Sequence, residues 1–128
     1  MPVQAIAKNV RISSRKVGVV AGLVRGRSVA DALVILSHVP RRSAVPVKKA
    51  IESARANADH NHNMKPDSLQ IIEITVTQGT RLKRFRPAAR GSALPYEKRS
   101  SHIRVIVDGE KRQPKKPVEA KKTDKETK

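Results

Sequence analysis

Apolar residues recur along this chain with two different periods, and the longer period predicts three helices. Steps of three and four place apolar residues on one face of each helix. The first face is Val17, Val20, Ala21 and Val24, the second is Val29, Ala32, Leu33 and Leu36, and the third is Ala44, Val47, Ile51, Ala54 and Ala58. Ser13 or Ser14, then Ser28, then Ser43 precede these faces as candidate N-caps. Gly26 and the polar run 57–63 are suited to end the first and third helices.

The shorter period, an alternation of apolar and polar residues, predicts strands. Ile72, Ile74 and Val76 alternate with polar neighbours, and Ile103, Val105 and Val107 repeat the pattern nearer the C-terminus. We expect these two strands to pair antiparallel. Residues 3–10 give a weaker strand signal, because Ala and Asn are poor strand formers.

The long connection between the two later strands predicts a protruding hairpin, residues 79–101, which we call the arm. A structureless connection of this length is unusual in a compact domain, so we expect the strands to continue outward. About 11 residues on each side would reach roughly 35 Å. Pro87, Gly91 and Pro95 are expected to bracket the tip. An isolated hairpin is only marginally stable in water, so the arm should be mobile when free and ordered by a partner.

Composition limits the rest of the picture. The 128 residues fit one domain, residues 1–109, followed by a disordered basic tail, residues 110–128. With one Phe and one Tyr, the core must be aliphatic. The absence of cysteine excludes disulfides and thiolate zinc sites. The longest apolar run, residues 17–24, is far too short to span a membrane, and we expect neither a membrane anchor nor a secretory signal.

The formal net charge of +17 is clustered, and this predicts an anionic polymer as partner. Residues 1–27 contain six cations and no acid, whereas residues 28–69 are nearly balanced. Residues 81–104 contain eight Lys or Arg and a single acid, Glu97. Two basic contact surfaces are therefore expected, one at the N-terminal flank and one on the arm. A flexible positive arm suits the irregular grooves of structured RNA better than duplex DNA.

Two aromatic residues of the arm leave two alternatives open. Phe85 and Tyr96 either stack on unpaired bases or pack on each other across the arm. Arg15 and Lys16 begin the first predicted helix, where the positive helix end disfavours cations, and a nearby phosphate would relieve that cost.

Catalytic and metal-binding motifs are lacking. Asp59, His60 and His62 are close in sequence, but no further ligands accompany them. Neither a nucleophile elbow nor a glycine-rich phosphate loop occurs, so we expect no enzyme, metal or cofactor. An RNA-modifying enzyme is one alternative, but the chain has no recognisable cofactor or nucleophile motif for it. A DNA-binding helix-turn-helix around Gly26-Arg27 is the other alternative, but its second helix has no Arg or Lys to contact base edges.

Four segments together resemble one protein family. They read RISSRKVGVVAGLVRGRSVADALVIL, ESARANADHNHN, TQGTRLKRFRPAARGSA and KRSSHIRVIV. In order and spacing they are similar to the bacterial family of large-subunit ribosomal protein twenty-two, over residues 5 to about 109. The resemblance implies an α+β fold, with a small three-stranded antiparallel sheet packed on three helices and a long protruding β-hairpin.

The resemblance also implies a function in the cytoplasmic ribosome. A monomer would bind 23S rRNA and aid early assembly of the large subunit. Its globular part would lie near the polypeptide exit, and its hairpin would line the nascent-peptide tunnel beside ribosomal protein four. The expected rRNA contacts are Lys8, Arg11, Arg15, Lys16, Arg25, Arg81, Lys83, Arg84, Arg86, Arg90, Lys98, Arg99 and His102.

The expected tunnel-lining tip, which the family links to macrolide sensitivity, is Pro87, Ala88, Ala89, Arg90, Gly91, Ser92 and Ala93. This chain departs from the family pattern there. It has Ala88 where the family usually has a basic residue, and Ser92 where the family often has another. We expect Arg90 to take over part of that role.

Overall fold

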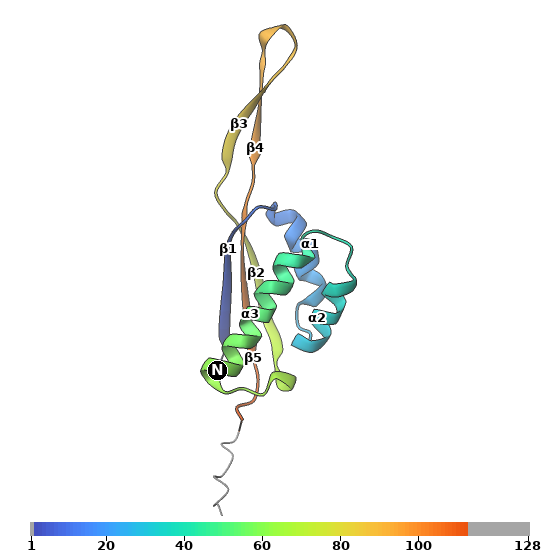
Figure 1. Cartoon of the computed structure of the whole chain (residues 1–128), viewed down its shortest axis with the longest axis vertical. Coiled ribbons are helices and arrows are strands. Elements are labelled where there is room, and N and C mark those ends of the chain that lie inside the picture. Colours follow the sequence, from blue (N-terminus) through green and yellow to red (C-terminus); the bar gives the residue numbers. More distant parts are fainter. Residues whose placement is uncertain (1, 113–128) are drawn as a thin grey trace, which may run out of the picture.

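The computed structural model describes residues 2–112, which form a small body and a projecting arm (Figure 1). A three-stranded antiparallel sheet has the order β1-β5-β2, and β3 pairs with β4 in a separate sheet. α1 and α3 lie against the larger sheet, and α2 packs on α3 (Figure 1). The elements, in chain order, are β1 (Val3–Val10), α1 (Ser14–Val24), α2 (Val29–His38), α3 (Ala44–His62), η1 (Pro66–Ser68), β2 (Gln70–Gln78), β3 (Leu82–Pro87), η2 (Ala89–Gly91), β4 (Ala93–Lys98) and β5 (Ser101–Asp108). The expected α+β fold is confirmed.

The helix ends follow from local chemistry at most of the predicted positions. The Ser28 hydroxyl accepts the Asp31 amide at 3.1 Å and donates to the Asp31 carboxylate at 2.7 Å, so it caps α2. Gly26 and Asn63 take left-handed φ angles after α1 and α3. Ser13 and Ser43 occupy the N-cap positions of α1 and α3, but neither side chain makes a capping hydrogen bond.

The core lies between one face of the sheet and the helices, and it is aliphatic. The predicted inward residues of β5, Ile103, Val105 and Val107, are fully buried. α3 packs on β1 and β5, and α1 packs on β2. Met64 and Leu69 close the core after α3, a contribution that the periodic pattern does not predict.

The alternation of Ile72, Ile74 and Val76 predicts a half-buried strand with all three on its buried face, and for Ile72 this prediction is wrong. Ile72 is 55% exposed, whereas its neighbour Ile71 is 1% exposed. The pairing with β5 shifts between Ile71 and Glu73, which marks a β-bulge. Because a bulge inserts one unpaired residue, it changes which residues of the strand face the core. The connection between α1 and α2 fixes this register, since Gly26 donates to the Ile71 carbonyl at 3.2 Å and Ile71 donates to Arg27 at 2.9 Å.

The start of the expected tail contacts the end of α3. Lys65 donates its amide to the Glu110 carbonyl at 2.9 Å, and Arg112 donates to the Asn63 carbonyl at 2.7 Å. The Arg112 guanidinium lies 3.2 Å from the Asp59 carboxylate. Residues 110–112 therefore belong to the described body, and the remainder of the expected tail, residues 113–128, lies outside the described residues.

Candidate nucleic-acid interface

The arm is a two-stranded hairpin that projects from the body (Figure 1). Its register runs from Leu82 opposite Lys98 to Pro87 opposite Ala93. Arg90 and Gly91, with φ of 58° and 72°, turn the chain at the tip. The tip predicted at residues 87–93 coincides with this turn. Pro95, which we expected to bracket the tip, instead pairs with Phe85 inside the hairpin.

The arm is a separate sheet rather than an unbroken continuation of β2 and β5. The strands are interrupted at residues 79–81 and 99–100, which we call the arm root. One backbone bond crosses the root, from the Gly79 amide to the Ser100 carbonyl at 2.9 Å. The Ser100 hydroxyl donates to the Thr80 carbonyl at 2.7 Å. The body and the arm are thus joined by a short, hydrogen-bonded neck.

The two aromatic side chains of the arm lie on opposite faces of the hairpin. Tyr96 is opposite Arg84, and Phe85 is opposite Pro95. Because neighbouring residues of a strand point to opposite faces, Phe85 and Tyr96 do not pack on each other, and that alternative is wrong. The Arg86 guanidinium instead covers the Tyr96 ring, 4.7 Å from its centroid. Phe85 is 74% exposed, so its ring is available for a partner.

Most arm cations are exposed and unneutralised. Glu97, the single acid of the arm, lies 3.2 Å from Arg99 and 3.8 Å from Arg81. Within residues 2–112, the other arm cations form no ion pair with an acidic side chain; they are Lys83, Arg84, Arg86, Arg90 and Lys98. The arm therefore presents a surface whose positive charge is largely uncompensated.

Two predicted contact residues of the body make intramolecular bonds. Arg25 donates to the Ile74 carbonyl at 2.9 Å and so ties the end of α1 to β2. His102 accepts the Asn9 amide on Nδ1 at 3.0 Å, beside an irregularity in the β1–β5 pairing. Their contacts with RNA stay predictions. Lys8, Arg11, Arg15 and Lys16 are exposed.

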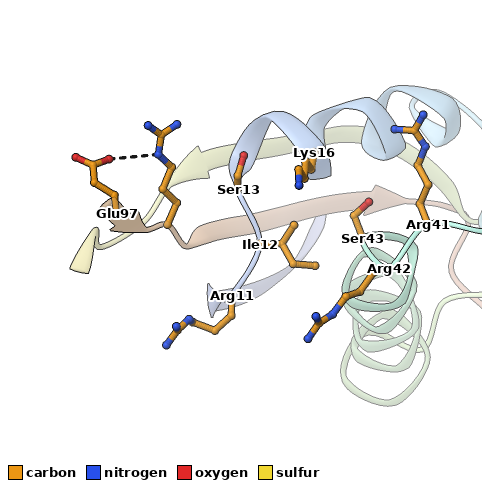
Figure 2. Close-up of a pocket in the computed structure, with 9 residues that line it drawn as sticks. Arg11, Ile12, Ser13, Lys16, Arg41, Arg42, Ser43 and Glu97 are labelled. Atoms are coloured by element: carbon orange, nitrogen blue, oxygen red, sulfur yellow. Dashed lines mark hydrogen bonds and ion pairs between the residues drawn. The ribbon is translucent and has the colours of Figure 1, made fainter. Parts of the chain in front are cut away.

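The fold brings three predicted cations together with two that the sequence analysis did not include. Arg11, Lys16 and Arg99 line a cavity of about 580 Å³ with Arg41 and Arg42 (Figure 2). These residues come from the β1–α1 loop, α1, the α2–α3 loop and the arm root. The sequence could have revealed Arg41 and Arg42 as contact residues. They directly precede the start of a predicted helix, as Arg11 does near Ser13.

A second, smaller cavity lies beside the first at the arm root. It measures about 230 Å³, and its lining is mainly polar. Arg15, Arg81 and Arg99 contribute its positive charge. Because Ser13 and Arg99 line both cavities, the start of α1 and the arm root form one continuous basic region.

The described residues offer no alternative chemical centre. Residues 2–112 contain no group of three His, Asp or Glu side chains placed to hold a metal ion. Asp59, which neighbours His60 and His62 in sequence, pairs with Arg112. None of the helices in this part of the chain has the length and apolar character needed to cross a membrane.

A small α+β scaffold that carries a long basic hairpin defines a class of protein whose functional feature is a charged surface rather than a catalytic cleft. Comparison with known proteins makes the assignment specific. The model of the family described as ribosomal protein L22p/L17e matches residues 5–108, and the chain belongs to this family. The family is structural and non-enzymatic, which excludes the RNA-modifying alternative.

Three relatives of high similarity carry the name large ribosomal subunit protein uL22. The protein of Oceanobacillus iheyensis is 49% identical over 111 residues, which cover 87% of this chain and 98% of the relative. The protein of Pediococcus pentosaceus is 49% identical over 104 residues, which cover 81% of this chain and 88% of the relative. The protein of Herpetosiphon aurantiacus is 49% identical over 108 residues, which cover 84% of this chain and 96% of the relative.

Proposed function

We propose that this chain is a structural constituent of the large ribosomal subunit in the cytoplasm, where it binds 23S rRNA as a monomer and aids early assembly. The observation that carries the proposal is the exposed, basic arm on a body of the L22p/L17e family. The relatives are named as large-subunit proteins, and the match extends over nearly the whole body.

The construction of the arm supports RNA as the partner. β3 and β4 pair with each other, and their side chains are nearly all exposed. A hairpin without a core is marginal in water, so it needs an external surface to hold one conformation. A negatively charged, irregular RNA surface supplies both charge complementarity and shape.

We further propose where the two parts lie in the subunit. The body lies near the polypeptide exit, and the arm runs inward along the wall of the nascent-peptide tunnel, beside ribosomal protein four. The tip, residues 87–93, faces the tunnel and influences macrolide sensitivity. Arg90 is the one cation of that segment, and its left-handed backbone places it in the turn itself.

An arm truncation tests this proposal. Lys83 and Glu97 are opposite each other, so residues 84–96 can be replaced by Asn-Gly, which closes a two-residue hairpin. We expect the truncated chain to fold and to enter large subunits, because the body core contains no residue of 84–96. The electron cryo-microscopy map should show the body in place and an altered tunnel wall, and the macrolide response should change.

Two results would contradict the proposal. One is a truncated chain that enters ribosomes whose tunnel structure and macrolide response are unchanged, which would remove the role of the arm. The other is an unmodified chain that does not sediment with the large subunit after a high-salt wash, or that prefers duplex DNA to 23S rRNA in direct competition.

A further inference from the structure

The cavity lined by Arg11, Lys16 and Arg99, which we call the junction cavity, has features of an anion site beyond its charge. Two helices begin at it: α1, of 11 residues, at Ser13, and α3, of 19 residues, at Ser43. Figure 2 shows both serines at these helix starts, with Lys16 on α1. The first amide groups of a helix have no intrahelical acceptor, and the helix dipole is positive at this end. Two positive helix ends therefore meet at one cavity.

Ser43 is the second, independent indication of a ligand. The residue is 5% exposed and lines the junction cavity. Its side chain does not cap α3, and within residues 2–112 its hydroxyl makes no hydrogen bond. The Ser43 oxygen is not fully enclosed, so it remains accessible from the cavity and can donate there. An acceptor in the cavity would satisfy it.

The charges around the cavity favour an acceptor on the side of the body rather than on the side of the arm. Within the described residues, Arg11, Lys16, Arg41 and Arg42 form no ion pair. Glu97 lies at the arm side of the cavity and is bound to Arg99 at 3.2 Å, as the dashed line in Figure 2 marks. Its carboxylate would repel an anion there. Glu97 is the single acid of the lining, so the region nearest Ser13 and Ser43 is positively charged.

We propose that the junction cavity binds a single phosphate group of an RNA backbone. The donors are the Ser43 hydroxyl and the amides of Ser14 and Arg15 at the start of α1, and Lys16, Arg41 and Arg42 supply the opposing charge. This inference rests on the proposed function, which supplies the RNA. Because Arg99 belongs to the arm root, a phosphate in the cavity also holds the arm in a fixed direction relative to the body.

The test uses the full chain and a 23S rRNA fragment, with two pairs of matched variants. Ser43→Ala and Arg42→Gln remove a donor and a charge from the cavity. Ser53→Ala and Arg55→Gln make the same chemical changes at exposed positions of α3 that do not line it. The Ser43 side chain makes no hydrogen bond within the described residues, and Arg42 is exposed, so circular dichroism should show that both variants fold.

We expect each cavity variant to weaken rRNA binding by about tenfold, the scale of one hydrogen bond to a charged group, and each control to weaken it far less. Phosphate-ethylation interference gives the sharper readout. With the unmodified chain, ethylation of one particular phosphate should block binding, and with Ser43→Ala that phosphate should no longer stand out. Inorganic phosphate, added as a competitor at millimolar concentration, should leave the difference in affinity between the cavity variants and their controls unchanged if the phosphate belongs to the RNA.

The outcomes separate this inference from the proposed function. If the unmodified chain binds 23S rRNA but the cavity variants match their controls in affinity and interference pattern, the phosphate site is wrong and the proposed function stands. If inorganic phosphate at millimolar concentration abolishes the difference between the variants and their controls, the ligand is free phosphate rather than RNA. A chain that does not bind 23S rRNA would overturn both.

Discussion

At the scale of single residues, Gly79 controls the geometry of the arm root. A Cβ atom at this position would lie 2.6 Å from Ser100 Oγ and 3.2 Å from the Ser100 carbonyl carbon. The Ser100 hydroxyl donates to the Thr80 carbonyl, so it cannot turn away without losing that bond. Gly18 in α1 is the opposite case, because a Cβ atom there would meet no atom within 4 Å.

We therefore predict opposite effects for the same substitution at these glycines. Gly79→Ala should lower the free energy of unfolding by about 1–3 kcal/mol, the usual cost of overpacking. Gly18→Ala should raise it by up to about 1 kcal/mol, because Ala favours the helix. Urea denaturation of the two variants and the unmodified chain measures both. Equal effects at the two positions would contradict the steric role of Gly79.

At the scale of elements, the arm and the body differ in what stabilises them. β5 lies between two strands and contributes buried Ile103, Val105 and Val107 to the core. β3 and β4 have only each other, and both strands are almost wholly exposed. Hydrogen bonds of an exposed hairpin open locally, without unfolding of the core.

Amide hydrogen exchange should reveal this difference directly. In the free protein we predict that amides of β3 and β4 exchange nearly as fast as in an unfolded peptide, whereas those of β5 stay protected. Addition of a 23S rRNA fragment should protect the arm amides and leave β5 unchanged. Arm amides as protected as those of β5 in the free protein would show that the arm needs no partner to be ordered.

At the scale of the whole molecule, the distribution of charge matters more than its total. The middle of the chain, residues 28–69, carries four acids as well as six cations, whereas the arm and the lining of the junction cavity carry many cations and share one acid, Glu97. These two regions adjoin at the arm root, since Arg99 belongs to both. The molecule thus presents one long basic surface from the start of α3 to the arm tip.

Salt dependence tests how much of this surface contacts phosphate. If about six cations engage RNA, affinity should fall by roughly a thousandfold between 50 and 200 mM salt. Replacing residues 84–96 by Asn-Gly removes Arg84, Arg86 and Arg90, and it should reduce the slope of log affinity against log salt by up to about three. An unchanged slope in filter-binding measurements would mean that the arm does not contact the RNA backbone.

The order of elements, the hairpin and the basic surface were all predictable from the sequence, because each depends on local information. Helical and strand periods are set by backbone geometry, so apolar spacing identified α1, α2, α3, β2 and β5. The long polar connection between two strands predicted an arm, and the clustering of charge predicted an anionic partner, which stays a prediction. The family resemblance, which the match over residues 5–108 confirms, follows from the same segments.

Only the tertiary structure decided features that depend on register and on which ends of elements meet. The bulge that exposes Ile72 arises from pairing with β5 and with the connection after α1. Register also places Phe85 and Tyr96 on opposite faces of the arm. The junction cavity joins segments around residues 11–16, 41–43 and 97–99, which are far apart in sequence. Their convergence follows from helices packed on a sheet, a long-range arrangement that no local period encodes.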